Sequence, residues 1–91
     1  MEILSFTMDN CPPARLVEES IESLLPELNT DLKKEIKLIK VNVLKQKEVA
    51  TAFQIAAVPT IVVLKKEKES GRLLGFYPRE EFKTKLKTFL I

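Results

Sequence analysis

The sequence predicts an α/β fold in which three helices cover a four-stranded mixed sheet. Short, densely apolar runs alternate along the chain with segments whose apolar residues recur at helical spacing. Their order is strand, helix, strand, helix, strand, strand, helix (β-α-β-α-β-β-α), which gives a right-handed parallel crossover followed by an antiparallel hairpin. A chain of 91 residues leaves no room for a second core, so one domain is expected over 1–91.

The first half of the chain predicts a buried strand followed by an amphipathic helix. The strand is expected over 2–7, antiparallel to the later strand from Thr60. Pro12 and Pro13 suit a first helical turn because their φ is already fixed near the helical value. The apolar face of the helix is formed by Val17, Ile21, Leu24, Leu25 and Leu28. Pro26 is expected to end or kink this helix, with a loop over 29–31.

The second half predicts three strands and two helices. The dense apolar run at 36–43 favours a central strand with helices on both sides, and a short helix is expected over 46–53. The β-branched run at 60–64 and the run at 72–76 predict a hairpin. The last helix is expected to begin near Pro78, where acidic residues precede basic ones and match the helix dipole. Its inward face is formed by Phe82, Leu86, Phe89 and Leu90.

Charge and composition argue against several classes of function. Lys and Arg total 15 against 13 for Asp and Glu, so a net charge of +2 gives no strong field for nucleic acid or anionic membrane. No apolar run approaches a membrane span, and the start has no signal-peptide pattern, so a cytoplasmic location is expected. The chain has no histidine and only two glycines, so no metal and no cofactor are expected. The abundant Lys and Glu are typical of proteins from hot environments and of ordinary helical surfaces alike.

Cys11 is the only cysteine, so any covalent sulfur chemistry must involve a second molecule. A solitary cysteine is commonly a buried, inert residue. This one, however, follows a strand and precedes a helix start, where unpaired amides and the positive helix end favour a thiolate. Arg15, one turn later, adds positive charge. Position therefore favours a reactive, partly exposed thiol.

Two motifs resemble the thioredoxin-like superfamily, in particular its small thioredoxin- and glutaredoxin-sized members. The first is Ser5-Phe6-Thr7-Met8-Asp9-Asn10-Cys11-Pro12-Pro13-Ala14-Arg15, which looks like the family's strand, cysteine loop and helix start. The second is Ile39-Lys40-Val41-Asn42-Val43 followed by Ala52-Phe53-Gln54-Ile55-Ala56-Ala57-Val58-Pro59-Thr60-Ile61. This run resembles the family's central strand, short helix and Val-Pro-Thr loop. Gly75 and the amphipathic tail also match, so the resemblance covers essentially the whole chain and implies the thioredoxin fold.

The resemblance also implies a site. It makes Cys11 the nucleophile, with Pro12 and Pro13 in the substrate-binding loop. It implies a cis peptide bond between Val58 and Pro59 that lies against the cysteine loop and leaves the backbone of Val58 to bind an extended substrate. The implied partners are protein or low-molecular-weight thiols and disulfides.

Three positions depart from the family pattern. Ala14 replaces the second cysteine of the Cys-x-x-Cys loop, which gives Cys-Pro-Pro-Ala. Asn10 stands where thioredoxins usually have Trp, and Ser5 where many have a buried Asp. Ala14 and Arg15 are therefore expected to modulate the site.

Three functions fit this pattern. The first is a thiol-disulfide oxidoreductase of single-cysteine type, which acts through mixed disulfides. The second is a redox-inactive adaptor that binds extended peptides in the same groove. The third is a resolving-cysteine mutant of a two-cysteine oxidoreductase. The sequence does not indicate the oligomeric state.

Overall fold

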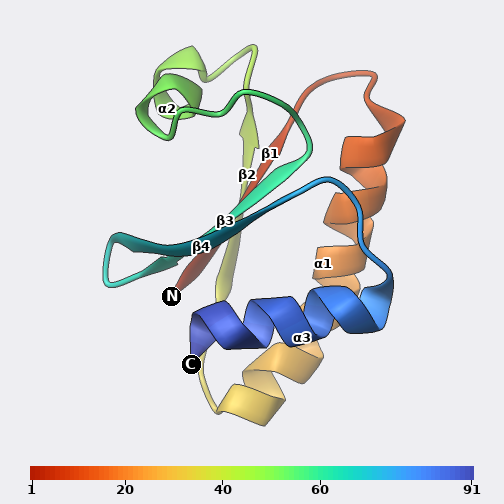
Figure 1. The fold of residues 1–91 in the computed structure, drawn as a ribbon, viewed down its shortest axis with the longest axis vertical. Helices are drawn as coiled ribbons and strands as arrows, with labels where there is room; N and C mark the ends of the chain where they lie inside the picture. The colour runs from red at the N-terminus through yellow and green to blue at the C-terminus, as the bar shows by residue number, and fades with distance from the viewer.

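The computed structural model describes residues 1–91 and contains the predicted four-stranded mixed sheet with three helices (Figure 1). In chain order the elements are β1 (Glu2–Thr7), α1 (Pro12–Leu32), β2 (Lys37–Asn42), α2 (Lys47–Ala52), β3 (Thr60–Lys65), β4 (Lys68–Leu74) and α3 (Arg79–Leu90). The strand order is β2-β1-β3-β4. As predicted, β1 runs parallel to β2 and antiparallel to β3.

The register of β1 places the functional loops at one end of the sheet. Phe6, near the end of β1, lies opposite Val41 of β2 and Thr60 of β3. The loop that leaves β1 toward α1 and the loop that enters β3 therefore lie at the same end of the strands.

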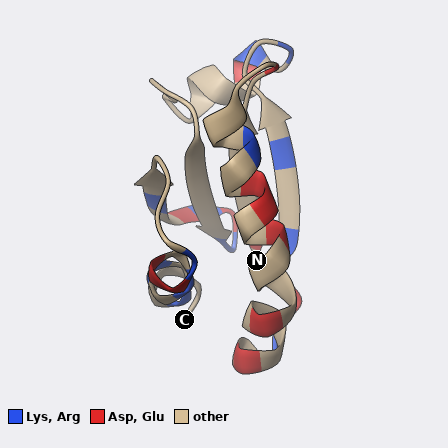
Figure 2. Ribbon diagram, turned by 90° about the vertical axis from the view of Figure 1, so that its right-hand side faces the viewer, with Lys and Arg blue, Asp and Glu red and all other residues tan.

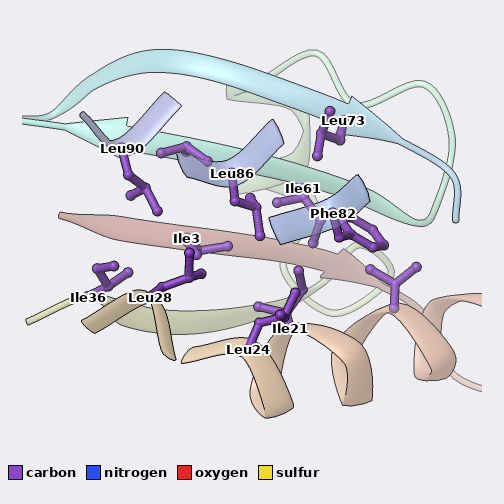
Figure 3. Close-up of a cluster of buried hydrophobic side chains, with 12 residues drawn as sticks. Ile3, Ile21, Leu24, Leu28, Ile36, Ile61, Leu73, Phe82, Leu86 and Leu90 are labelled. Carbon is purple, nitrogen blue, oxygen red and sulfur yellow. The ribbon is translucent and has the colours of Figure 1, made fainter. Parts of the chain in front are cut away.

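Each face of the sheet has its own apolar core, as the alternation of side chains along a strand requires. On one face, Ile3 and Ile61 pack against α1 and α3 (Figure 3). On the other face, Phe6 packs against α2, with its ring 5.7 Å from that of Phe53. Figure 1 shows α2 on the opposite side of the sheet from α1 and α3.

The prediction that 36–43 forms a central strand is wrong, because β2 is the edge of the sheet. It pairs only with β1. Within β2 only Val41 is buried, and Ile39 is 37% exposed. A dense apolar run suggested two covered faces, but α2 is too short to cover the outer part of this strand.

The predicted end of the first helix near Pro26 is also wrong. Proline removes only one N–H from the ladder, and α1 continues to Leu32 with Leu28 fully buried. The predicted loop at 29–31 is the last turn of the helix, where Asn29 Oδ1 accepts a hydrogen bond from the Ile36 N–H at 3.0 Å. Lys33 ends α1 in the left-handed conformation, with φ of 52°.

The hairpin is longer than predicted. Lys66 and Glu67 both have positive φ, of 52° and 67°, and form a two-residue turn between β3 and β4. As a result β4 begins at Lys68, four residues before its predicted start. It ends before Gly75, whose φ is 89°.

Candidate functional site

Cys11 lies at the N-terminal end of α1, where it is the capping residue of the helix. It is half-buried and free. The preceding residue, Asn10, has a φ of 56°, in the left-handed region that asparagine tolerates better than most residues. This backbone requirement gives a physical reason for asparagine immediately before the cysteine.

The helix start gives Cys11 fewer amide donors than the sequence suggested. Pro12 and Pro13 have no N–H, and the N–H of Arg15 bonds to the carbonyl oxygen of Cys11 at 3.1 Å. The Cys11 side chain makes no capping hydrogen bond. The positive charge near Cys11 comes from two sources. One is the N-terminal end of α1, which has no acidic residue in its first turn, and the other is the side chain of Arg15.

Arg15 is largely exposed, so its influence is screened by solvent. Its Nε lies 3.5 Å from Glu19 Oε1, in an i,i+4 pair on the surface of α1. Arg15 therefore lies within one helix turn of Cys11, but Glu19 partly neutralises its positive charge.

Ala14, which stands at the position of the family's second cysteine, is fully buried with 0% exposure. Ser5 on β1 is buried as well, at 1% exposure. Two of the three departures from the family pattern therefore lie in the interior, whereas Asn10 is exposed and Cys11 partly exposed to solvent.

A groove of about 700 Å³ opens beside Cys11. It runs between the β1–α1 loop and the end of β2. Its lining includes Thr7, Met8, Cys11, Arg15, Leu16 and Asn42. The thiol is therefore next to a space large enough for a small molecule or a peptide side chain.

A second, apolar hollow of about 300 Å³ lies next to this groove. It is lined by Met8, Val43, Ile55, Ala56, Ala57 and Val58. Because Met8 lines both spaces, the cysteine loop and the Val58 loop are neighbours.

The loop before β3 has an unusual backbone. The Val58–Pro59 peptide bond is cis, as the resemblance of the second motif implied. The N–H and the C=O of Val58 have no hydrogen-bond partner. Two main-chain groups next to the apolar hollow are therefore available to an external backbone.

Two polar residues whose role the sequence did not indicate, Asn42 and Thr60, hold these loops. Asn42 Nδ2 donates to Asp9 Oδ1 at 3.1 Å and so ties the cysteine loop to the end of β2. Thr60 Oγ1 donates to the Ala57 carbonyl at 2.6 Å. Asparagine at a strand end is a turn signal, but only the fold reveals its partner across the sheet.

The family model described as Thioredoxin matches residues 1–88. The chain belongs to the thioredoxin family. Membership places it among thioredoxin-like redox proteins. None of the helices of this thioredoxin-family chain has both the length and the apolar character needed to span a membrane.

Curated thioredoxins are similar over most of this chain. Thioredoxin from Mycoplasma pneumoniae is 31% identical over 77 residues, which cover 85% of this chain and 71% of that protein. Thioredoxin from Mycoplasma genitalium is 30% identical over the same share of each chain.

Solved structures share the thioredoxin fold at lower identity. Thioredoxin 1 from the thermophilic eubacterium Thermosipho africanus superposes with a TM-score of 0.72 at 21% identity, over 99% of this chain and 94% of that one. Thioredoxin from Trypanosoma brucei brucei gives a TM-score of 0.78 at 21% identity, over 98% of this chain and 74% of that one.

Proposed function

We propose that this thioredoxin-family chain is a thiol-disulfide exchange protein that acts through the single nucleophile Cys11. The observation that carries the proposal is the position of Cys11 at the start of α1, partly exposed and lining an open groove. The neighbouring apolar hollow and the unpartnered backbone of Val58 supply a place for the substrate chain.

The reaction divides into three exchanges. In the first, the Cys11 thiolate attacks one sulfur of a substrate disulfide, the substrate S–S bond breaks, and its other sulfur leaves as a thiolate. In the second, an external thiolate attacks the Cys11 sulfur and releases the remaining substrate thiol. A second external thiol then regenerates the Cys11 thiolate and leaves as a disulfide, so two external thiols are oxidised for each substrate disulfide reduced.

The external thiol is required because Ala14 carries no sulfur. The substrates that fit are protein and low-molecular-weight disulfides. Val58 and Pro59 would align an extended segment beside the thiol, with Pro12 and Pro13, both exposed, forming the opposite side of the contact.

Trapping the mixed disulfide tests this function. The reduced protein is mixed with an equimolar peptide disulfide without other thiols, and the products are measured by intact mass spectrometry. We expect a mixed disulfide at Cys11 that persists until a small thiol is added. The Cys11→Ser variant must give no adduct, and an unmodified wild-type protein would contradict the proposal.

A peptide-binding adaptor is the second candidate. It is favoured by the burial of Ala14 and Ser5, because both interior groups that would support a two-cysteine cycle are absent. An adaptor binds an extended peptide equally well with Cys11 replaced by serine and forms no adduct. The remaining explanation, a resolving-cysteine mutant, is tested by the codon at position 14 of the native gene.

A further inference from the structure

Two hydrogen bonds hold the loop that enters β3. Thr60 Oγ1 donates to the carbonyl oxygen of Ala57 at 2.6 Å, and the N–H of Gly75 donates to the carbonyl oxygen of Pro59 at 3.0 Å. They fix the chain on either side of Val58. The first bond comes from a side chain, whereas the second is between main-chain groups.

Thr60 carries a polar hydroxyl at a buried position where an apolar side chain would be expected. The residue is 4% exposed and begins a strand whose next three residues, Ile61, Val62 and Val63, are buried and apolar. Valine has nearly the same shape and is likewise enriched in strands. A buried hydroxyl costs free energy unless it is hydrogen-bonded, so its contribution at this position is the bond to Ala57.

That bond shapes the part of the loop that faces the substrate. Ala57 and Val58 both line the apolar hollow, and the N–H and C=O of Val58 have no partner within the chain. If the Ala57 carbonyl were released, the loop would be held only on the Pro59 side, and the Ala57–Val58 peptide plane, which carries the N–H of Val58, would be free to rotate. The donor that an extended substrate needs would then lose its fixed direction.

We propose that Thr60 is a positioning residue for extended peptides, which acts by holding the Ala57 carbonyl and thereby orienting the backbone of Val58. This inference rests on the proposed function where it concerns the reaction of Cys11 with a peptide disulfide. Binding of the peptide beside Val58 does not depend on that reaction. Thr60 itself touches no reacting atom. It acts on peptide recognition and leaves the reactivity of Cys11 unchanged.

The test uses Thr60→Val, which removes the hydroxyl, and Thr60→Ser, which keeps it. The probe is a seven-residue peptide rich in alanine and valine whose central cysteine is joined to thionitrobenzoate by a disulfide. Attack by Cys11 on the peptide sulfur forms the mixed disulfide and releases coloured thionitrobenzoate. Its release is followed against peptide concentration.

We expect Thr60→Val to raise the half-saturating peptide concentration about three- to tenfold, the effect of losing one hydrogen bond, with little change in the limiting rate. Thr60→Ser should behave as the wild type. Alkylation of Cys11 by iodoacetamide and its reaction with dithiobis(nitrobenzoate), which has no peptide backbone, should be unaffected in both variants. Equal half-saturation in Thr60→Val and wild type, or an equal slowing of all three reactions, overturns the inference.

Binding without chemistry separates this inference from the proposed function. A peptide with serine in place of the cysteine is titrated into each protein and followed through the amide signal of Val58. Thr60→Val should weaken binding several-fold and Thr60→Ser should not. If the wild type forms no mixed disulfide but this difference persists, the proposed function fails and the role of Thr60 stands. If the difference is absent, the role of Thr60 fails whatever Cys11 does.

Discussion

Arg72 on β4 donates a hydrogen bond from Nη2 to the main-chain carbonyl oxygen of Phe53, at 3.0 Å. Phe53 is the residue at which α2 ends, and carbonyls at a helix end have no partner within the helix. The same guanidinium bonds both carboxylate oxygens of Glu69, at 2.6 Å each. This pairing raises the pKa of Arg72 and lowers that of Glu69. Arg72 thus anchors the end of α2, and with it the loop toward Val58, to the sheet.

Replacing Arg72 by lysine should loosen the end of α2. Lysine keeps the charge but cannot bond Glu69 and the Phe53 carbonyl with one rigid fork. The N–H of Phe53, which bonds Val49, and that of Ile55, which bonds Ala50, should exchange with solvent faster in an NMR experiment. Arg79→Lys is the matched control, since Arg79 bonds Glu27 on α1, and it should leave these two amides unchanged. Equal protection in both variants would contradict the anchoring role.

Gly71→Ala should destabilise the fold by about 1–3 kcal/mol through overpacking. A Cβ at Gly71 would lie 2.3–2.6 Å from three ring carbons of Phe89, so α3 or the ring must move away from β4. Urea denaturation measures the loss. Lys68→Ala, at an exposed position of the same strand, is the control. A double-mutant cycle with Phe89→Ala should recover part of the loss, and strict additivity would rule out the clash as its cause.

Acid should weaken the junction between α1 and α3 (Figure 2). Hydrogen bonds from Arg79 and Lys83 hold the pKa of Glu27 below its ordinary 4.5, and a hydrogen bond from Lys87 holds that of Asp31 below 3.8. The unfolded chain therefore takes up protons first as the pH falls. The stabilisation is complete at neutral pH and declines below about pH 4.5. Because all these groups are solvated, the change is modest and decreases with salt.

The comparison of variants isolates this acid effect. The urea midpoint should fall less between pH 7 and pH 3 in the double variant Glu27→Gln, Asp31→Asn than in the wild type. Glu35→Gln, which removes an exposed carboxylate that lies outside the helices and forms no ion pair, should show the full wild-type decline. If the double variant declines as steeply as the wild type, other carboxylates are responsible.

Ala14→Cys should convert the protein from one that accumulates a mixed disulfide into one that resolves it. The new thiol would lie three residues after Cys11 in the first turn of α1, shielded from external thiols by the burial of this position. In a single turnover without other thiols, the wild type should retain the substrate. The variant should release it fully reduced and end with a disulfide between positions 11 and 14. Retention of the substrate by the variant would assign the limitation to Ser5 or Asn10.

Most of the architecture could be predicted from local patterns. The bounds of β1 were predicted to the residue, because its apolar run ends in polar turn residues. The position of β2 at the edge could not be predicted, since density of apolar residues does not reveal how many neighbours a strand has. The continuation of α1 past Pro26 depends on tertiary packing of Leu28, which local propensity does not contain.

The candidate site was predictable in outline and not in its supporting contacts. Cys11 and the Val58-Pro59 pair were predicted from two separate motifs, although Cys11 lies 47 residues before Val58. The partners Asp9 and Asn42 are 33 residues apart and meet only because β1 and β2 are adjacent. The two prolines after Cys11 suited a helix start, as predicted, but they also removed two of the amide donors that a helix start normally provides.

The central place of β1 in the sheet sets an order of events during synthesis. β1 is synthesised before both of its partners, Lys37–Asn42 and Thr60–Lys65. It can pair with β2 once that strand has been made, but its other edge stays unpaired until β3 follows. Loop closure over such separations must precede these pairs. Completion of the sheet is thus a late step, and the loops that flank Cys11 acquire their shape only with it.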